Sequence, residues 1–346
     1  MRGRILILGG ILAVLALTAA ALFGSAEPDA TLPPAETSTT EIALPENRDT
    51  ELYRAVIARF AKGEGYYEAV SDLHRERSYP LFPFFTVRQP TLAWISVNVG
   101  TLGLYLIAWL VLLAIIAVWY RSLASQSFAV RAAFVGILAL GGASTITPAG
   151  IVMHEFWCGL LITLSLGFMR QEHWPMRLLF AALALSLREF ALAYLVVLGF
   201  NAILGRRWQE VLGVAAIVGL FAGGMALHQQ AVDAVRIATD LKSPPWSGFR
   251  GPEGLVGDLS QVSWLGLLPW PLAAFLTFLP LAGWLLAPNR VTASLWFAGF
   301  GATIAIFARP NNTYWILVIL PAYLAGLAFL ARSRSLLTNT SEIGTR

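Results

Sequence analysis

The stretch AALALSLREFALAYLVVLG, residues 181–199, decides the fold class because it is almost wholly apolar and yet carries Arg188 and Glu189 side by side. An unsolvated charge in the middle of a bilayer costs about 3 kcal/mol or more, so charges in such a run face each other or a wet cavity. The rest of the chain is equally apolar. Hydrophobic residues make up 57% and charged residues 13% of the 346 residues, which indicates a polytopic membrane protein rather than a soluble domain.

Long apolar segments recur along the chain and predict an all-α membrane fold with about 8–10 transmembrane helices. Most segments approach the ~20 residues that span a bilayer, and they are too long for the strands of a β-barrel. The segments are 5–23, 92–119, 128–145, 151–168, 178–204, 211–227, 264–287, 291–307 and 314–331.

Segment 178–204 has two interpretations that differ in topology. Basic residues favour the cytoplasmic side, and Arg2 and Arg4 before the first segment place Met1 inside. Arg206 and Arg207 are then also inside if 178–204 is a hairpin of two half-helices that enters and leaves on the cytoplasmic side. We favour this hairpin, with Arg188 and Glu189 at its apex lining a cavity near mid-membrane. One tilted span is the alternative.

With the hairpin, residues 1–346 form a single transmembrane domain with two long outer loops, 24–91 and 228–263. In the first loop, 24–48 is rich in Pro and Thr and predicts a flexible spacer. Residues 49–79 place apolar side chains at helical spacing and predict amphipathic helices on the membrane surface. The first apolar segment is expected to be a retained helix, although the following FGSA resembles a signal-peptide cleavage site.

Polar residues predicted at the outer membrane face come from separate segments but share one side of the membrane. Together they supply a carboxylate base, cations that stabilise developing negative charge, and aromatic walls. Such a set suits sugar transfer from a lipid phosphate, because the lipid tail holds the donor beside the bilayer and the phosphate leaves as an anion. The charged candidates and histidines are Asp49, Arg88, His154, Glu155, Arg188, Glu189, His228 and Arg309, and the aromatic candidates are Tyr53, Tyr66, Tyr67 and Trp157.

Four stretches carry a resemblance to a known superfamily: RDTELYRAVIARFAKGEGYY (48–67), HEFWCGLL (154–161), LSLREF (185–190) and ILGRRWQE (203–210). Their order and the large first outer loop resemble the GT-C superfamily of membrane glycosyltransferases. The resemblance implies inverting transfer from a polyprenyl-phosphate sugar to a lipid, glycan or protein acceptor, with Asp49 as base. It also implies a bacterial inner-membrane protein whose active site faces the periplasm.

Other interpretations of these residues stay open. The spacer before Asp49 departs from the superfamily pattern, so Glu46 or Glu51 is an alternative base. Asp49 is also placed to cap the helix that follows it, and Arg188 and Glu189 could simply neutralise each other. Glu155 and His154 open a helix, where the dipole favours a carboxylate. His228 could serve only as a cation at a helix end, and Arg309 only as a contact to headgroups.

Other function classes compete with sugar transfer. A transporter or flippase for a lipid-linked or anionic substrate is the main rival, because transporters also contain broken helices with charges near the midplane. The absence of a visible inverted repeat argues against a transporter. A scaffold protein of envelope assembly is a third interpretation. The net charge of +4 does not indicate nucleic acid, because the basic residues are scattered at segment ends. A divalent cation is left open, since His154, Glu155 and His228 show no ligand spacing.

Overall fold

The computed structural model is all-helical within the residues that it describes, which contain no β-strand. The described residues are 2–23, 48–244 and 249–331. The proposed spacer 24–48 and the alternative base Glu46 therefore lie outside them, apart from Arg48. Residue contacts divide the chain into two compact units: residues 1–44, 126–144 and 246–346 form the first, and residues 45–125 and 145–245 form the second.

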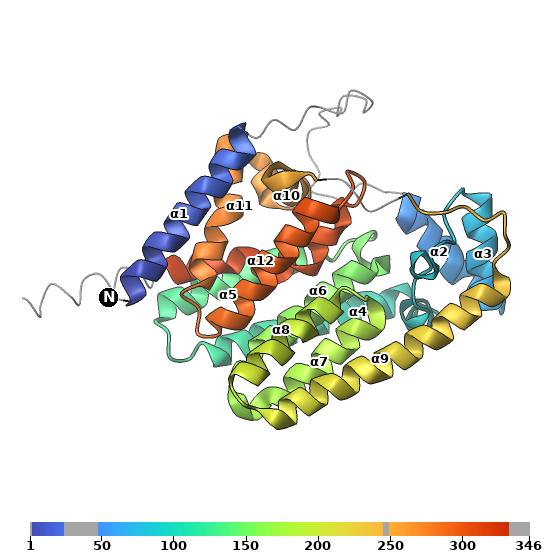
Figure 1. The fold of residues 1–346 in the computed structure, drawn as a ribbon, viewed down its shortest axis with the longest axis horizontal. Helices are drawn as coiled ribbons and strands as arrows, with labels where there is room; N and C mark the ends of the chain where they lie inside the picture. Colours follow the sequence, from blue (N-terminus) through green and yellow to red (C-terminus); the bar gives the residue numbers. More distant parts are fainter. Residues whose placement is uncertain (1, 24–47, 245–248, 332–346) are drawn as a thin grey trace, which may run out of the picture. The chain divides into compact units, whose positions relative to one another are not determined.

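The first unit packs around Trp284, which is fully buried between Phe134, Phe297 and Phe329. A Cβ atom on Gly283 would collide with the Gly326 carbonyl oxygen, so glycine is what allows these two backbones to approach. Helix α1 lies against α11 (Figure 1). The elements are α1 (Arg2–Phe23), α5 (Phe128–Ala143), α10 (Gly251–Val262), η4 (Trp264–Leu267), α11 (Trp270–Trp284), α12 (Arg290–Phe307), η5 (Thr313–Val318), α13 (Leu320–Tyr323) and η6 (Leu324–Leu330).

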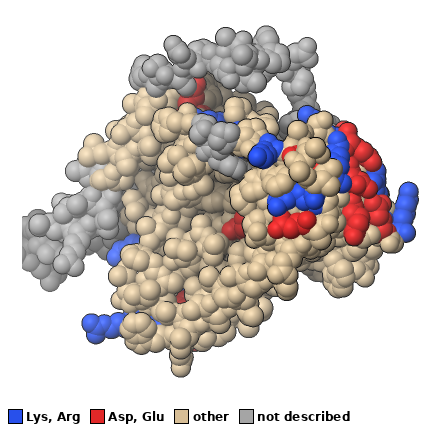
Figure 2. All heavy atoms as spheres, turned by 45° about the vertical axis from the view of Figure 1, so that its right-hand side comes forward, with Lys and Arg blue, Asp and Glu red and all other residues tan. Residues whose placement is uncertain are grey.

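The second unit begins with two short amphipathic helices, α2 (Arg48–Ala61) and α3 (Tyr66–Glu76). Their apolar faces share a core with Val232 of α9 (Trp208–Val235). Arg75 on the polar face of α3 pairs with Asp240, with 2.8 Å between Nε and Oδ1. On the face in Figure 2, charged side chains gather over α2 and α3, as the amphipathic pattern of 49–79 predicts.

His74 makes this surface region sensitive to acid. Its ring is buried in α3 and its Nδ1 lies 2.9 Å from the Pro80 carbonyl oxygen. Burial lowers the pKa of His74 to about 4, whereas an unfolded histidine titrates near ~6.5. The unfolded state therefore binds more protons between these values, so stability should fall as the pH drops from about 6.5 to about 4.

We expect His74→Gln to remove part of this acid sensitivity, because glutamine does not titrate and its amide can still donate to Pro80. The measurement is the unfolding midpoint of both proteins in detergent at several pH values between 4 and 8, a window set by the two pKa values. Equal slopes for the two proteins below pH ~6.5 would contradict the assignment.

The remaining helices of the second unit form a bundle in which α9 runs along α7 and α8 (Figure 1). Segment 178–204 is two helices, broken at residues 188–190. Arg177 near the start of α7 and Arg207 after the end of α8 both pair with Glu210, at 2.5 and 2.8 Å, so the chain returns to the end where it started. The bundle consists of α4 (Thr91–Ser122), α6 (His154–Gly167), α7 (Trp174–Leu187), α8 (Ala191–Leu204) and α9, with short turns η1 (Phe84–Thr86), η2 (Gly150–Val152) and η3 (Gln171–His173).

Among the residues that the structure describes, three stretches are long and apolar enough to cross a membrane: Phe84–Ser122, Trp208–Val235 and Arg290–Phe307. Other predicted segments form shorter apolar helices, and 264–287 begins its long helix only at Trp270, because Pro269 and Pro271 fix the start. Segment 314–331 consists mostly of 3₁₀ turns rather than one α-helix.

Candidate functional site

Arg88 links α2 and α3 to the bundle. Its Nε donates to the Tyr53 hydroxyl of α2 at 2.9 Å, and its carbonyl accepts from the Tyr66 hydroxyl of α3 at 2.8 Å. On its other side, Nη2 lies 3.8 Å from Glu155 Oε1 at the start of α6. Sequence reasoning selected all four residues, and the second unit brings them together.

Glu155 and Arg188 form the centre of a charge cluster that also contains Arg88 and Glu189. Arg188 Nε lies 2.7 Å from Glu155 Oε1, and the same guanidinium pairs with Glu189. Arg188 leaves the helical conformation at the end of α7, with φ −149° and ψ 125°, and this break lets its side chain meet α6. Two arginines and two carboxylates make the cluster neutral, which is the condition under which charges tolerate burial.

The sequence analysis expects Arg188 to line a cavity, and the structure buries it instead. The Arg188 side chain is 1% exposed, whereas that of Glu189 is 31% exposed and that of Arg88 is 13% exposed. The reason is Glu155: a buried carboxylate needs a counter-charge, and the α7–α8 break supplies it. Arg188 is therefore neutralised by Glu155 as well as by Glu189, and the sequence of residues 188–189 does not reveal this additional partner.

A small pocket lies beside the cluster. It is lined in part by Tyr53, Tyr66, Arg88 and His154, and its volume is about 20 Å³, roughly the room for one water molecule. The His154 ring is buried and meets the Tyr53 ring edge to face, with centroids 5.1 Å apart. A sugar does not fit here in this arrangement.

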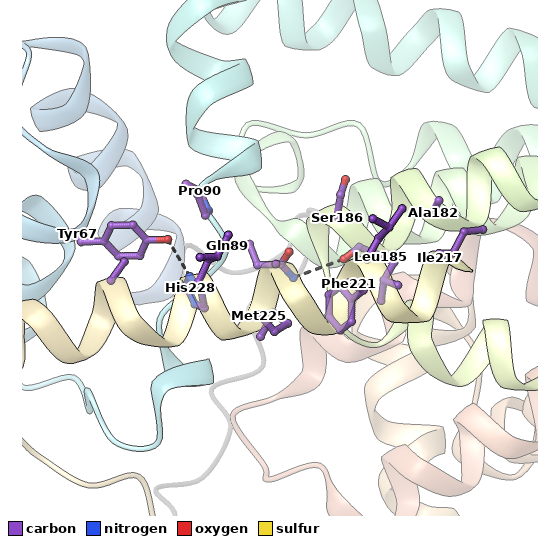
Figure 3. A pocket seen from close by; sticks show the side chains of 14 residues that line it. Tyr67, Gln89, Pro90, Ala182, Leu185, Ser186, Ile217, Phe221, Met225 and His228 are labelled. Carbon is purple, nitrogen blue, oxygen red and sulfur yellow. Dashed lines mark hydrogen bonds between the residues drawn. The ribbon is translucent and has the colours of Figure 1, made fainter. Parts of the chain in front are cut away.

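A larger cavity, the α7–α9 groove, has a volume of about 590 Å³ and lies between these helices and the segment that precedes α4. Apolar residues such as Leu185, Ile217 and Phe221 line most of it (Figure 3). Its polar end holds Tyr67 and His228. Figure 3 shows these two side chains together at one end, with Ile217 at the other.

Hydrogen bonds fix the polar end of this groove. His228 Nε2 lies 3.1 Å from the Val87 carbonyl, which can only accept, so Nε2 carries the hydrogen. Nδ1 of the neutral ring then accepts from the Tyr67 hydroxyl at 3.0 Å. Gln89 Nε2 donates to the Leu185 carbonyl at 3.4 Å. The predicted helix end at residue 227 is wrong, because α9 continues to Val235 and carries His228 within its length.

Asp49 lies in the first turn of α2 and is half-buried. Its Oδ1 accepts a hydrogen bond from the Tyr79 hydroxyl at 2.7 Å. Burial raises the pKa of Tyr79, which therefore stays protonated and donates. Asp49 lines neither the small pocket nor the α7–α9 groove. Sequence reasoning missed Tyr79, since no spacing pattern ties residue 79 to residue 49.

Two other predicted residues take different places. Trp157 donates through Nε1 to the Ile151 carbonyl at 2.9 Å and is buried in α6. Arg309 belongs to the first unit, where its carbonyl accepts from Arg250 at 3.4 Å and its N–H donates to Asn312 at 3.2 Å. It is therefore not among the residues that the second unit brings together.

Among the residues that the structure describes, no three His, Cys, Asp or Glu side chains lie close enough together to hold a metal ion. Comparison of the chain with protein-family models, with curated proteins and with solved structures finds no match.

Proposed function

We propose that the protein is a membrane glycosyltransferase of the GT-C type, which transfers a sugar from a polyprenyl-phosphate donor to an acceptor hydroxyl with inversion. The observation that carries the proposal is the α7–α9 groove, which is apolar along most of its length and polar at the Tyr67 and His228 end. An isoprenoid chain needs an apolar track beside the bilayer, and its phosphate needs polar groups where the track ends.

In the proposed reaction, the acceptor oxygen bonds to the anomeric carbon while the bond from that carbon to the phosphate oxygen breaks. The acceptor proton passes to Asp49, and the electron pair leaves with the polyprenyl phosphate. Arg88 is the better placed arginine to stabilise that anion, because it is the more exposed of the two in the cluster and is followed directly by Gln89 of the groove. Tyr53 and Tyr66 hold Arg88 in position.

Donor binding in this proposal requires a movement of α2. The pocket between Tyr53 and His154 holds about 20 Å³, which is roughly one water molecule. Opening it would separate the Tyr53 ring from His154 and make room beside Arg88. Motions of this kind accompany substrate binding in many enzymes.

The proposed topology is that of an inner-membrane protein with about 8–10 spans and with α2 and α3 on the periplasmic face. In it, α7 and α8 form the half-helix hairpin. The proposal is supported by Glu210, which pairs with basic residues at both ends of that hairpin. It is also supported by the apolar stretches long enough to span a bilayer.

A transporter remains the second candidate, because the charged break between α7 and α8 would also suit substrate translocation. The two functions differ in what happens to the donor.

Proteoliposomes would be loaded with undecaprenyl-phosphate hexoses and decaprenyl-phosphate pentoses, and supplied with bacterial membrane extract as the acceptor source. We expect free polyprenyl phosphate to appear only with the protein. Movement of intact donor between leaflets, without its cleavage, would contradict the transferase and favour the transporter.

A further inference from the structure

A second groove in the second unit, which we call the Arg54 groove, shares no lining residue with the α7–α9 groove. It is formed by α2, the first half of α4 and residues 148–152, and its volume is about 510 Å³. Gly100 opens it: the φ of this residue is +68°, which interrupts α4, and a Cβ atom there would meet nothing within 4 Å. The groove therefore depends on the bend in α4, which requires a positive φ that glycine adopts easily and other residues do not.

The walls of the Arg54 groove are amphipathic. Ile57, Leu104 and Ile151 supply an apolar lining, while Thr101 and Tyr105 add hydroxyl groups. At its rim, Arg54 Nη2 donates to the Pro148 carbonyl at 2.9 Å, which holds the guanidinium in place. A fixed positive charge beside an apolar channel is the complement of an anionic amphiphile.

The surroundings of this groove indicate which amphiphile. The adjacent surface of α4 exposes Trp94, Leu102 and Leu106, which are 60%, 72% and 57% exposed, as a helix facing lipid would. Helix α2 is amphipathic and so suits the membrane surface. The groove thus lies between an amphipathic helix and a stretch that is long and apolar enough to span a membrane.

We propose that the Arg54 groove binds an anionic phospholipid, with an acyl chain along Ile57 and Leu104 and the phosphate at Arg54. Arginine binds phosphate through a planar set of N–H donors, and a net negative headgroup is favoured over a zwitterionic one. Ile57 and Val152 also line the small pocket around Tyr53 and His154, so the bound lipid would pack directly behind that wall. The site does not depend on the sugar-transfer proposal.

Native mass spectrometry of the full-length protein tests this site. The protein would be released from detergent with phosphatidylglycerol or phosphatidylcholine of identical acyl chains. We expect the wild type to retain phosphatidylglycerol over phosphatidylcholine, and Arg54→Gln to lose that preference by about fivefold or more. Arg59→Gln is the matched control, because Arg59 is on the same helix but pairs with Glu76 outside the groove. It should behave as the wild type.

A second variant keeps the test decisive if Arg54→Gln folds poorly. Ala58→Phe adds a ring at an exposed position that lines the groove, and it should reduce retention of both lipids. Equal losses in Arg54→Gln and Arg59→Gln would reduce the effect to diffuse surface attraction and overturn the proposal. Unchanged lipid retention in both Arg54→Gln and Ala58→Phe would also overturn the proposal. Competition by glycerol 3-phosphate as strong as competition by the lipid would overturn it as well, because it would indicate a phosphate site that does not bind an acyl chain.

Discussion

Glu155→Gln should destabilise the protein by about 3–5 kcal/mol, the usual consequence of leaving a buried charge without its partner. Glu155 is fully buried and lies within 2.7 Å of Arg188 and 3.8 Å of Arg88. Glutamine would leave two guanidiniums beside each other with only the partly exposed Glu189 to balance them. The measurement is the free energy of unfolding of purified protein in detergent.

Two further variants separate charge balance from shape. Glu189→Gln removes a carboxylate of the same cluster that is 31% exposed, and Arg188 keeps Glu155 as its partner, so the loss should be only about 1 kcal/mol. The double variant Glu155→Leu with Arg188→Met leaves no uncompensated charge at this pair and should recover much of the stability. If Glu155→Gln unfolds at the same midpoint as the wild type, the charge pairing of Glu155 does not stabilise the second unit.

Helix positions were predictable where apolar composition alone decides them. The segment 92–119 forms α4 and 291–307 forms α12, within a few residues at each end. Residues 228–235 begin with three polar residues, which favours a loop, but the stretch contains no Gly or Pro to end a helix, so α9 continues through it. Helix α10 was missed although Pro252 and the spacing of Leu255, Val256 and Leu259 favour a helix.

Partners of the polar residues were harder to predict than the residues themselves. The sequence singles out Arg188 as a charge in an apolar run, but its contact with Glu155 joins residues 33 positions apart in the chain, and a single sequence does not reveal such a pairing. The hydrogen bond from Tyr79 to Asp49 is another case, since it depends on how the chain turns after α3. Cavities follow from packing, so the α7–α9 groove had no sequence signal beyond the apolar character of its helices.

Asp49→Asn should lower turnover roughly 100-fold or more if Asp49 is the base, because asparagine keeps the shape of the side chain but cannot take up the acceptor proton. The hydrogen bond from Tyr79 survives, since the Asn carbonyl oxygen can still accept it. A role in helix structure alone would therefore survive the change. Glu51→Gln is the matched control: it also removes one carboxylate from the first turn of α2, but Glu51 is exposed and lies 3.7 Å from Arg77.

The most direct measurement of the central claim is the rate of polyprenyl phosphate release from a polyprenyl-phosphate sugar by wild type, Asp49→Asn and Glu51→Gln, with donor binding measured on the same samples. The account predicts release by the wild type and Glu51→Gln at similar rates, and intact donor binding with lost release in Asp49→Asn. Near-normal release in Asp49→Asn would contradict Asp49 as base, and no release by the wild type from any of the pentose or hexose donors would contradict sugar transfer itself.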